Sequence, residues 1–160
     1  MSLVLSQIVT DREMLARYIL TESWLYKDNR AGSPLKANAF MPYRGEVSVF
    51  RVDELNSTQR IAIGEAVAKE RERKHREAAL SQGHAYPETK CTYRYRGRGE
   101  LTAGDVRING LDVISQEPPE RHANICGWPP QSGNKRTDEA AQMLYALKLQ
   151  QKAVFIPSGL

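Results

Sequence analysis

The stretch Glu117–Pro130 reads EPPERHANICGWPP and holds the densest group of unusual side chains in the chain. Residues that precede a proline are pushed toward extended conformations, so Glu117 and Trp128 are expected to lie outside any helix. The segment between the two proline pairs is therefore predicted as a strand or a stiff loop. In a strand, alternate side chains point to opposite faces of the sheet. One face would then carry His122, Asn124 and Cys126, and the other Ala123, Ile125 and Gly127.

The polar face of this segment has two interpretations. In the functional one, His122 is an acid, a base or a phosphate contact, and Asn124 orients a ligand or a water beside it, since histidine titrates near neutral pH. In the structural one, Ile125 and Trp128 are core residues, while His122 and Asn124 hydrogen-bond the proline-rich turn. A single His-x-Asn pair is a weak signal beside a full catalytic motif, which favours the structural interpretation.

The length of 160 residues predicts a single domain that buries about two-thirds of the surface of its unfolded chain. Cys91 and Cys126 fit no paired metal-binding pattern, so we expect reduced thiols in a cytoplasmic protein, without metal or cofactor. No basic leader precedes an apolar run, and no stretch approaches the ~20 apolar residues that span a bilayer. We therefore expect a soluble protein with no membrane association.

Positive charge is concentrated in two short segments of a chain whose formal net charge is +4. Lys69–Glu77 (KERERKHRE) carries five Lys and Arg against three Glu, and Lys90–Arg98 (KCTYRYRGR) carries four with no acid. In the second segment, guanidinium groups alternate with aromatic rings, a combination that single-stranded nucleic-acid binders use for phosphates and bases. The candidate contacts there are Tyr93, Arg94, Tyr95, Arg96 and Arg98.

Two capping boxes predict the starts of the first two helices. Thr10–Glu13 matches one, and the apolar spacing that follows predicts a helix at 11–20. Asn56 and Gln59 form the other and open a long helix that ends near Leu80. The second half of this helix is almost entirely charged, which is typical of a helix that projects from the core into solvent.

Two shorter helices are expected later in the chain. One covers 101–110, with Thr102 as its cap and Gly110 after its end. The other begins near Thr137, with acidic residues in its first turn and lysines toward its end, the polarity that complements a helix dipole. Its buried stripe is predicted as Met143, Leu144 and Leu147.

Alternating patterns predict the strands. Segments 36–42 and 46–52 are expected to form the central hairpin, because both faces of the second are partly apolar. Gly97–Gly99 is expected as a tight turn after a strand. The remaining strands are placed at 89–96, 111–115 and 153–156, and the core is predicted to include Val49, Val67, Ile125 and Leu144.

These elements add up to an α+β single domain over 1–160. We expect a small mixed or antiparallel sheet, one long and partly projecting helix, and a C-terminal amphipathic helix.

Three segments carry a resemblance to a family of small uncharacterised bacterial proteins, over roughly residues 30–150. They are a Lys-x-x-Ala-Phe segment at Lys36, a Ser-Val-x-Arg strand at Ser48, and a His-Ala-x-Ile-x-Gly segment at His122. The resemblance implies no activity, so function has to come from the site itself. It does imply that Lys36, Arg51 and His122 converge on one surface.

Three function classes follow from these residues. The first is a protein that binds single-stranded nucleic acid or RNA through the Lys90–Arg98 segment. The second is a small enzyme acting on a phosphate ester or nucleotide, with His122 as acid or base beside Asn124 and with Lys36, Arg51 or Arg121 holding the anionic group. The third is an accessory subunit whose charged helix and whose Trp24 or Trp128 meet a neighbour-encoded protein.

Overall fold

The computed structural model describes residues 5–27 and 33–160 and contains one antiparallel sheet of six strands in the order β4-β5-β2-β1-β3-β6. The predicted α+β fold class is confirmed. The strands are β1 Met14–Ile19, β2 Val47–Arg51, β3 Gly97–Thr102, β4 Asp112–Ser115, β5 His122–Cys126 and β6 Val154–Pro157. The helices are α1 Ser57–Ser81, α2 Ala103–Ile108 and α3 Lys135–Lys152, with short 3-10 helices η1 Glu22–Trp24 and η2 Ala37–Phe40.

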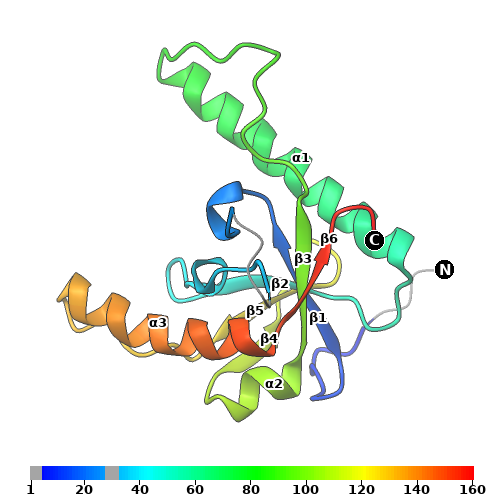
Figure 1. Cartoon of the computed structure of the whole chain (residues 1–160), viewed down its shortest axis with the longest axis vertical. Coiled ribbons are helices and arrows are strands. Elements are labelled where there is room, and N and C mark those ends of the chain that lie inside the picture. The colour runs from blue at the N-terminus through cyan, green and yellow to red at the C-terminus, as the bar shows by residue number, and fades with distance from the viewer. Residues whose placement is uncertain (1–4, 28–32) are drawn as a thin grey trace.

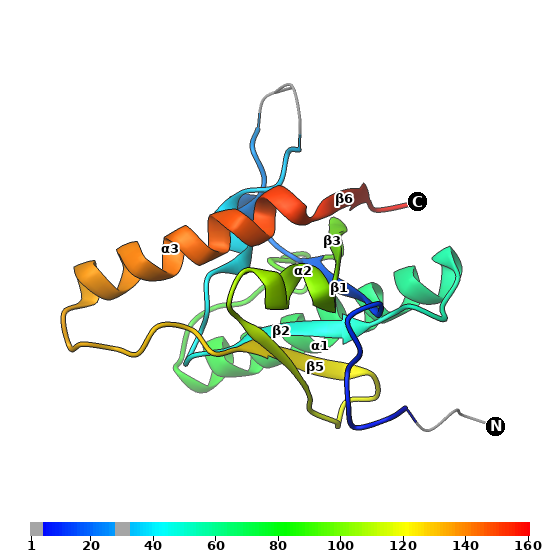
Figure 2. The same cartoon turned by 90° about the horizontal axis from the view of Figure 1, so that it is seen from below.

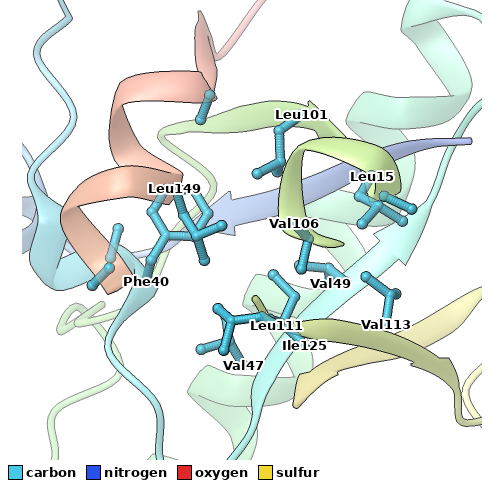
Figure 3. Packing of buried hydrophobic residues seen from close by; sticks show 14 of the residues in the cluster. Leu15, Phe40, Val47, Val49, Leu101, Val106, Leu111, Val113, Ile125 and Leu149 are labelled. Carbon is cyan, nitrogen blue, oxygen red and sulfur yellow. The ribbon is translucent and has the colours of Figure 1, made fainter. Parts of the chain in front are cut away.

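Helices lie on both sides of the sheet. In Figure 2, α2 and α3 lie on one side and α1 on the opposite side. The main hydrophobic core fills the space between the sheet, α2, α3 and η2 (Figure 3). The packed face predicted for β5 belongs to this core, because Ala123 and Ile125 are fully buried. The fully buried side chains of this main core include Leu15, Phe40, Val47, Val49, Leu101, Val106 and Leu149.

The first half of α1 packs on the other side of the sheet. Gly64 and Ala68 are buried there, and a Cβ added to Gly64 would lie 2.6 Å from the ring of Tyr95. Glycine therefore permits the close approach of this helix to the sheet. The predicted Asn56–Gln59 capping box is present, with both hydrogen bonds formed. Figure 1 shows the second half of α1 extending away from the body, as its charge pattern predicted.

The segment after α1 runs back along the helix without forming the strand predicted at 89–96. Glu72 holds it, because its carboxylate accepts from the Tyr86 hydroxyl and from the amides of Thr92 and Tyr93 at 3.1 and 2.8 Å. The ring of His75 packs edge-on against those of Tyr86 and Tyr93. Strand pairing begins only at Gly97, so the predicted turn at Gly97–Gly99 is instead the start of β3.

The helix predicted at 11–20 is wrong, because this segment forms β1. Its amide and carbonyl groups pair with β3 along the whole strand and with β2 at one end. Four of its six side chains are buried, on both faces, and that burial outweighs the helical spacing. The capping-box residues form a turn instead, in which the Thr10 amide donates to Glu13 at 2.8 Å.

The hairpin predicted between 36–42 and 46–52 is also wrong. Residues 37–40 form η2, which packs on α3, while β2 pairs with β5 and β1. The predicted central position of β2 is confirmed by these two neighbours.

The buried face of α3 differs from the predicted stripe. Leu144 and Leu147 are 64% and 43% exposed, whereas Gln142, Ala146 and Leu149 are buried. The helix begins at Lys135, one residue after its Asn134 cap. Its hydrophobic residues are spread around the helix, so their spacing alone did not identify the face that meets η2. Val49 and Ile125 are core residues as predicted, and Val67 is partly buried.

Candidate nucleotide pocket

A pocket of about 920 Å³ lies on the same side of the sheet as α1. Its floor contains Ser48 and Phe50 of β2 and His122 and Asn124 of β5, and further residues come from η1, α1 and the segment after α1. This volume falls within the roughly 300–1,000 Å³ typical of small-molecule sites. The pocket therefore lies over the polar face that the sequence predicted for β5.

His122 is held by hydrogen bonds at both ring nitrogens. Its Nδ1 atom lies 2.8 Å from the backbone carbonyl oxygen of Gln116, and its Nε2 atom lies 2.6 Å from the hydroxyl of Ser48. A carbonyl oxygen only accepts, so Nδ1 carries a proton. In the neutral ring, Nε2 is then free to accept the Ser48 proton. The ring also packs edge-on against Phe50, with centroids 5.4 Å apart.

Both interpretations of His122 find support in this geometry. The ring is partly buried and bonded to the segment before Pro118, as the structural interpretation predicted. It also lines the pocket beside Ser48, which is exposed, and beside Asn124, as the functional interpretation predicted. Asn124 is 6% exposed and donates to the carboxylate of Glu46 at 2.9 Å.

Arg17 lies at the wall of the pocket with a fixed orientation. Its Nε donates to the carbonyl of Ala39 at 2.8 Å and one terminal nitrogen to the carbonyl of Ser48 at 3.0 Å, while the guanidinium stacks over Trp24 at 4.6 Å. Burial, and after it the charge of Arg71, lower the pKa of Arg17 to about 10, so the group stays charged at neutral pH.

Arg71 brings a second guanidinium to the pocket from α1. It stacks over Tyr93 at 5.1 Å, so each arginine of the pocket lies on an aromatic ring that also lines it. Among the described residues, neither Arg17 nor Arg71 forms an ion pair with a carboxylate. Two cations that repel each other and lack an acidic partner favour an anion between or beside them.

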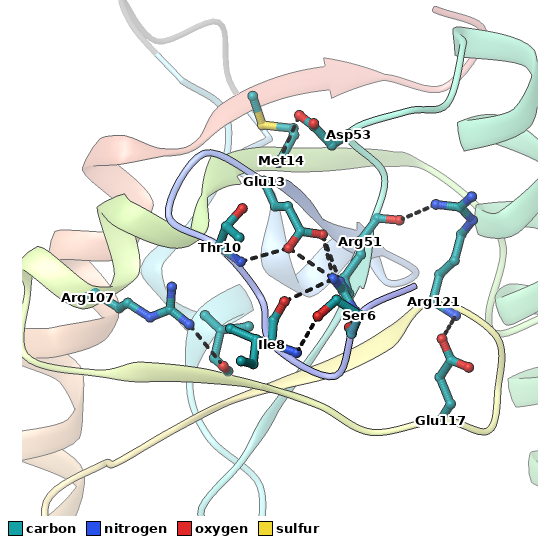
Figure 4. A network of polar contacts seen from close by, with 11 residues as sticks. Ser6, Ile8, Thr10, Glu13, Met14, Arg51, Asp53, Arg107, Glu117 and Arg121 are labelled. Atoms are coloured by element: carbon teal, nitrogen blue, oxygen red, sulfur yellow. Dashed lines mark hydrogen bonds and ion pairs between the residues drawn. The ribbon is translucent and has the colours of Figure 1, made fainter. Parts of the chain in front are cut away.

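Arg51 lies on the opposite face of β2 from Ser48 and is only 2% exposed. Figure 4 shows its guanidinium enclosed by the N-terminal segment. It forms two hydrogen bonds to the Glu13 carboxylate, at 2.8 and 2.9 Å, and one to the Ser6 carbonyl at 2.6 Å. Its donors are thus directed at partners within the chain. Arg121 donates to the Arg51 carbonyl at 3.3 Å and does not line the pocket.

Lys36, Arg51 and His122 do not converge on one surface. The Lys36 ammonium lies 5.5 Å from the ring centre of Tyr26, and Lys36 is absent from the pocket lining. Arg51 is separated from His122 by the sheet itself. The implied convergence is therefore wrong, because β2 directs Ser48 and Arg51 to opposite faces.

The candidate residues of the Lys90–Arg98 segment are separated from one another. Arg98 is 2% exposed and bonds to Glu100 and the Tyr95 hydroxyl at 3.0 and 2.9 Å. Arg96 pairs with Glu22 at 3.2 Å. Arg94 is exposed, and Tyr93 lies in the pocket wall. Only some of the predicted nucleic-acid contacts in this segment therefore face solvent.

Sequence reasoning missed Ser48, Arg17 and Arg71 as members of this site. Arg17 was assigned to a helix, where its direction relative to β2 could not be seen. Ser48 lies in the strand predicted at 46–52, but its neighbour in space depends on the β2–β5 register. Arg71 was one cation in a charged run, and only the position of α1 distinguishes it from its neighbours.

Trp128 is 8% exposed, and its indole nitrogen donates to the Ile125 carbonyl at 3.0 Å, so its ring belongs to the core. Trp24 is partly buried and lines the pocket. Both cysteines are free thiols. In the part of the chain that the structure describes, no helix combines the length and apolarity needed to cross a membrane.

Comparison of the chain with protein-family models, curated proteins and solved structures gave no match.

Proposed function

We propose that this pocket binds a nucleotide unit, either free or at the end of a single-stranded nucleic acid. Arg17 and Arg71 contact the phosphate, and the base lies against the aromatic rings of the wall. The main support for this proposal is the pair of guanidinium groups of Arg17 and Arg71. Each is stacked on an aromatic ring, and neither forms an ion pair with any of the described residues. Guanidinium is suited to this role because its planar donors match the oxygens of a phosphate.

The aromatic residues support a base as the second part of the ligand. Trp24 and Tyr93 line the pocket together with Phe50. Stacking of a base on such rings stabilises single-strand complexes by about 1–3 kcal/mol per base and tolerates any base. A phosphate alone would make no contact with these rings.

A nucleotide-binding pocket is compatible with two function classes expected from the sequence, nucleic-acid association and action on a nucleotide. In this proposal the Lys90–Arg98 segment contributes fewer contacts than expected, because Arg98 is buried and Arg96 is paired. Tyr93 stays in the proposed contact set, and Arg94 is available only to a strand that continues out of the pocket.

Isothermal titration calorimetry of the full chain tests the proposal. The ligands are AMP, adenosine, inorganic phosphate and a 5′-phosphorylated hexanucleotide. We expect AMP to bind more tightly than adenosine or phosphate alone, since each lacks half of the contacts. If the hexanucleotide binds more tightly than AMP, the ligand of the site is the end of a single strand. If the two bind equally tightly, the ligand is the free nucleotide.

The matched variants are Arg71→Gln and Arg73→Gln. Both lie on the exposed part of α1, but Arg73 is paired with Glu70 and Glu77 and does not line the pocket. Loss of one charge-assisted hydrogen bond costs about 1.5–3 kcal/mol, so Arg71→Gln should weaken AMP binding by about 10- to 100-fold. Equal affinities of the two variants, or no binding of any nucleotide by the wild type, would contradict the proposal and favour the accessory-subunit class.

A further inference from the structure

Ser48 and His122 form a hydrogen-bonded chain that ends on a backbone carbonyl. The Ser48 hydroxyl lies 2.6 Å from Nε2 of His122, and Nδ1 of the same ring lies 2.8 Å from the carbonyl oxygen of Gln116. The carbonyl fixes the tautomer in which Nε2 is the acceptor. The serine proton is thus directed at a base, and the base is oriented by a third group. Nucleophile, base and orienting group in this order define an activated serine.

The sheet holds this arrangement in place. Ser48 and His122 lie on adjacent antiparallel strands, in which Ser48 pairs with Asn124 and Phe50 pairs with His122. Both side chains therefore project from the same face toward the pocket. Phe50 supports the imidazole from the side. Groups held on rigid strands keep a reactive geometry better than groups on loops.

Exposure distinguishes a reactive serine from one that only supports the fold. Ser48 is exposed and lines the pocket, so its oxygen is open to a ligand. A hydroxyl that served packing alone would be enclosed and would satisfy a buried partner. His122 needs no second bond from serine for its orientation, because Gln116 and Phe50 already fix the ring.

Positive charge in the pocket selects the substrate class. Arg17 lines the pocket and donates to the backbone carbonyl of Ser48 at 3.0 Å, so its guanidinium is held at the strand that carries the candidate nucleophile. Arg71 lines the same pocket. Phosphoryl transfer places negative charge on the non-bridging oxygens of the transition state, and fixed guanidinium groups stabilise that charge.

We propose that Ser48 is a nucleophile and His122 its general base in the hydrolysis of a phosphate ester of a nucleotide, an activity that rests on the proposed nucleotide pocket. Oγ of Ser48 attacks phosphorus and gives its proton to Nε2 of His122. A bond from Oγ to phosphorus forms, the bond to the leaving oxygen breaks, and His122 returns the proton to that oxygen. A water then attacks the phosphoserine ester, passes a proton to His122, and Ser48 leaves with a proton regained from the imidazole.

The test uses thymidine 5′-(4-nitrophenyl phosphate) as the probe with the full chain. We expect release of nitrophenol and, in acid-quenched samples, a thymidylyl adduct that peptide mass spectrometry places on Ser48. Ser48→Ala should abolish both while it retains affinity for thymidine 5′-phosphate. Ser115→Ala, a serine on β4 outside the pocket, should behave as the wild type. His122→Gln should slow release by about 10²- to 10⁴-fold, the usual contribution of general base catalysis.

The stereochemical course at phosphorus gives a second readout that needs no accumulated adduct. Two displacements through Ser48 predict net retention of configuration with a chiral phosphorothioate ester, whereas direct attack by water predicts inversion. Inversion, undiminished turnover of Ser48→Ala, or nucleotide binding without any turnover would overturn the Ser48 proposal and leave the pocket assignment standing. No turnover together with no measurable affinity for thymidine 5′-phosphate would instead overturn both the pocket assignment and the Ser48 proposal.

Discussion

The Nε2 atom of His122 lies 2.6 Å from the hydroxyl oxygen of Ser48, although 74 positions separate the two residues in the sequence. The pairing of β2 with β5 brings them together, and the exposed position of Ser48 opens the pair to the pocket. The contact gives His122 a partner that its neighbours in the sequence do not supply. It also makes the two interpretations of this histidine separable by experiment.

Replacement of His122 by Asn should leave the fold nearly intact. Ser48 and Gln116 are both exposed, and water can replace the partner that each of them loses, so we expect the unfolding free energy to fall by less than about 1 kcal/mol. Hydrolysis of the nitrophenyl probe should be lost at the same time. Urea denaturation and turnover are measured on one preparation. A loss of stability of about 1–3 kcal/mol with a proportionate loss of activity would show that His122 is structural.

The sequence predicted a strand or a stiff loop at 122–127 and, for a strand, the two faces that β5 has, because proline pairs and alternating side chains are local signals. It also located the caps of α1 and α2, where short-range hydrogen bonds decide the helix start. It failed at β1, whose apolar spacing fits a helix as well as a doubly buried strand. The partners of Ser48, Arg17 and Arg51 depend on how the strands and the segments beside them pair, and the place of Arg71 in the pocket depends on α1 docking. These contacts are non-local, so the spacing of residues does not indicate them.

The buried pair of Arg51 and Glu13 should contribute strongly to stability. Their side chains are 3% and 15% exposed. Removing one partner of a buried pair leaves the other charge uncompensated and costs about 3–5 kcal/mol. We expect this loss for Glu13→Gln in chemical denaturation. The control is Glu77→Gln, whose pair with Arg73 is exposed and should cost less than about 1 kcal/mol. Similar losses for both variants would show that the Glu13 pair is not buried in solution.

Gly64→Ala should destabilise the protein, although alanine is the better helix former. Helix propensity alone would favour the variant by about 1 kcal/mol. The added Cβ, however, would lie 2.6 Å from Tyr95 and 2.7 Å from Tyr18, and overpacking of this kind typically costs about 1–3 kcal/mol. The denaturation midpoint should therefore fall. A higher denaturation midpoint for Gly64→Ala than for the wild type would mean that α1 does not pack against the rings of Tyr95 and Tyr18.

Asp112 should contribute to the acid sensitivity of stability. The hydrogen bond from Arg107, and after it the Val113 amide, lower the pKa of Asp112 in the folded state. A lowered pKa gives a favourable contribution above the unfolded value of about 3.9, which is lost as pH falls through the folded value. Carboxyl ¹³C NMR should show the Asp112 pKa moving back toward its ordinary range in Arg107→Gln. An unchanged titration in that variant would rule out Arg107 as the cause.

The most direct test of the nucleotide pocket is a ¹H–¹⁵N NMR titration of the wild-type chain with AMP. The protein has two tryptophans, and their indole signals report on two different places. Trp24 lines the pocket, whereas the Trp128 indole is buried and bonded to the Ile125 carbonyl. We predict saturable shifts of the Trp24 indole and of the backbone amides of Ser48, His122 and Arg71, with the Trp128 indole unmoved. Shifts confined to Lys90–Arg98, or no saturable shift at the Trp24 indole, would contradict the account.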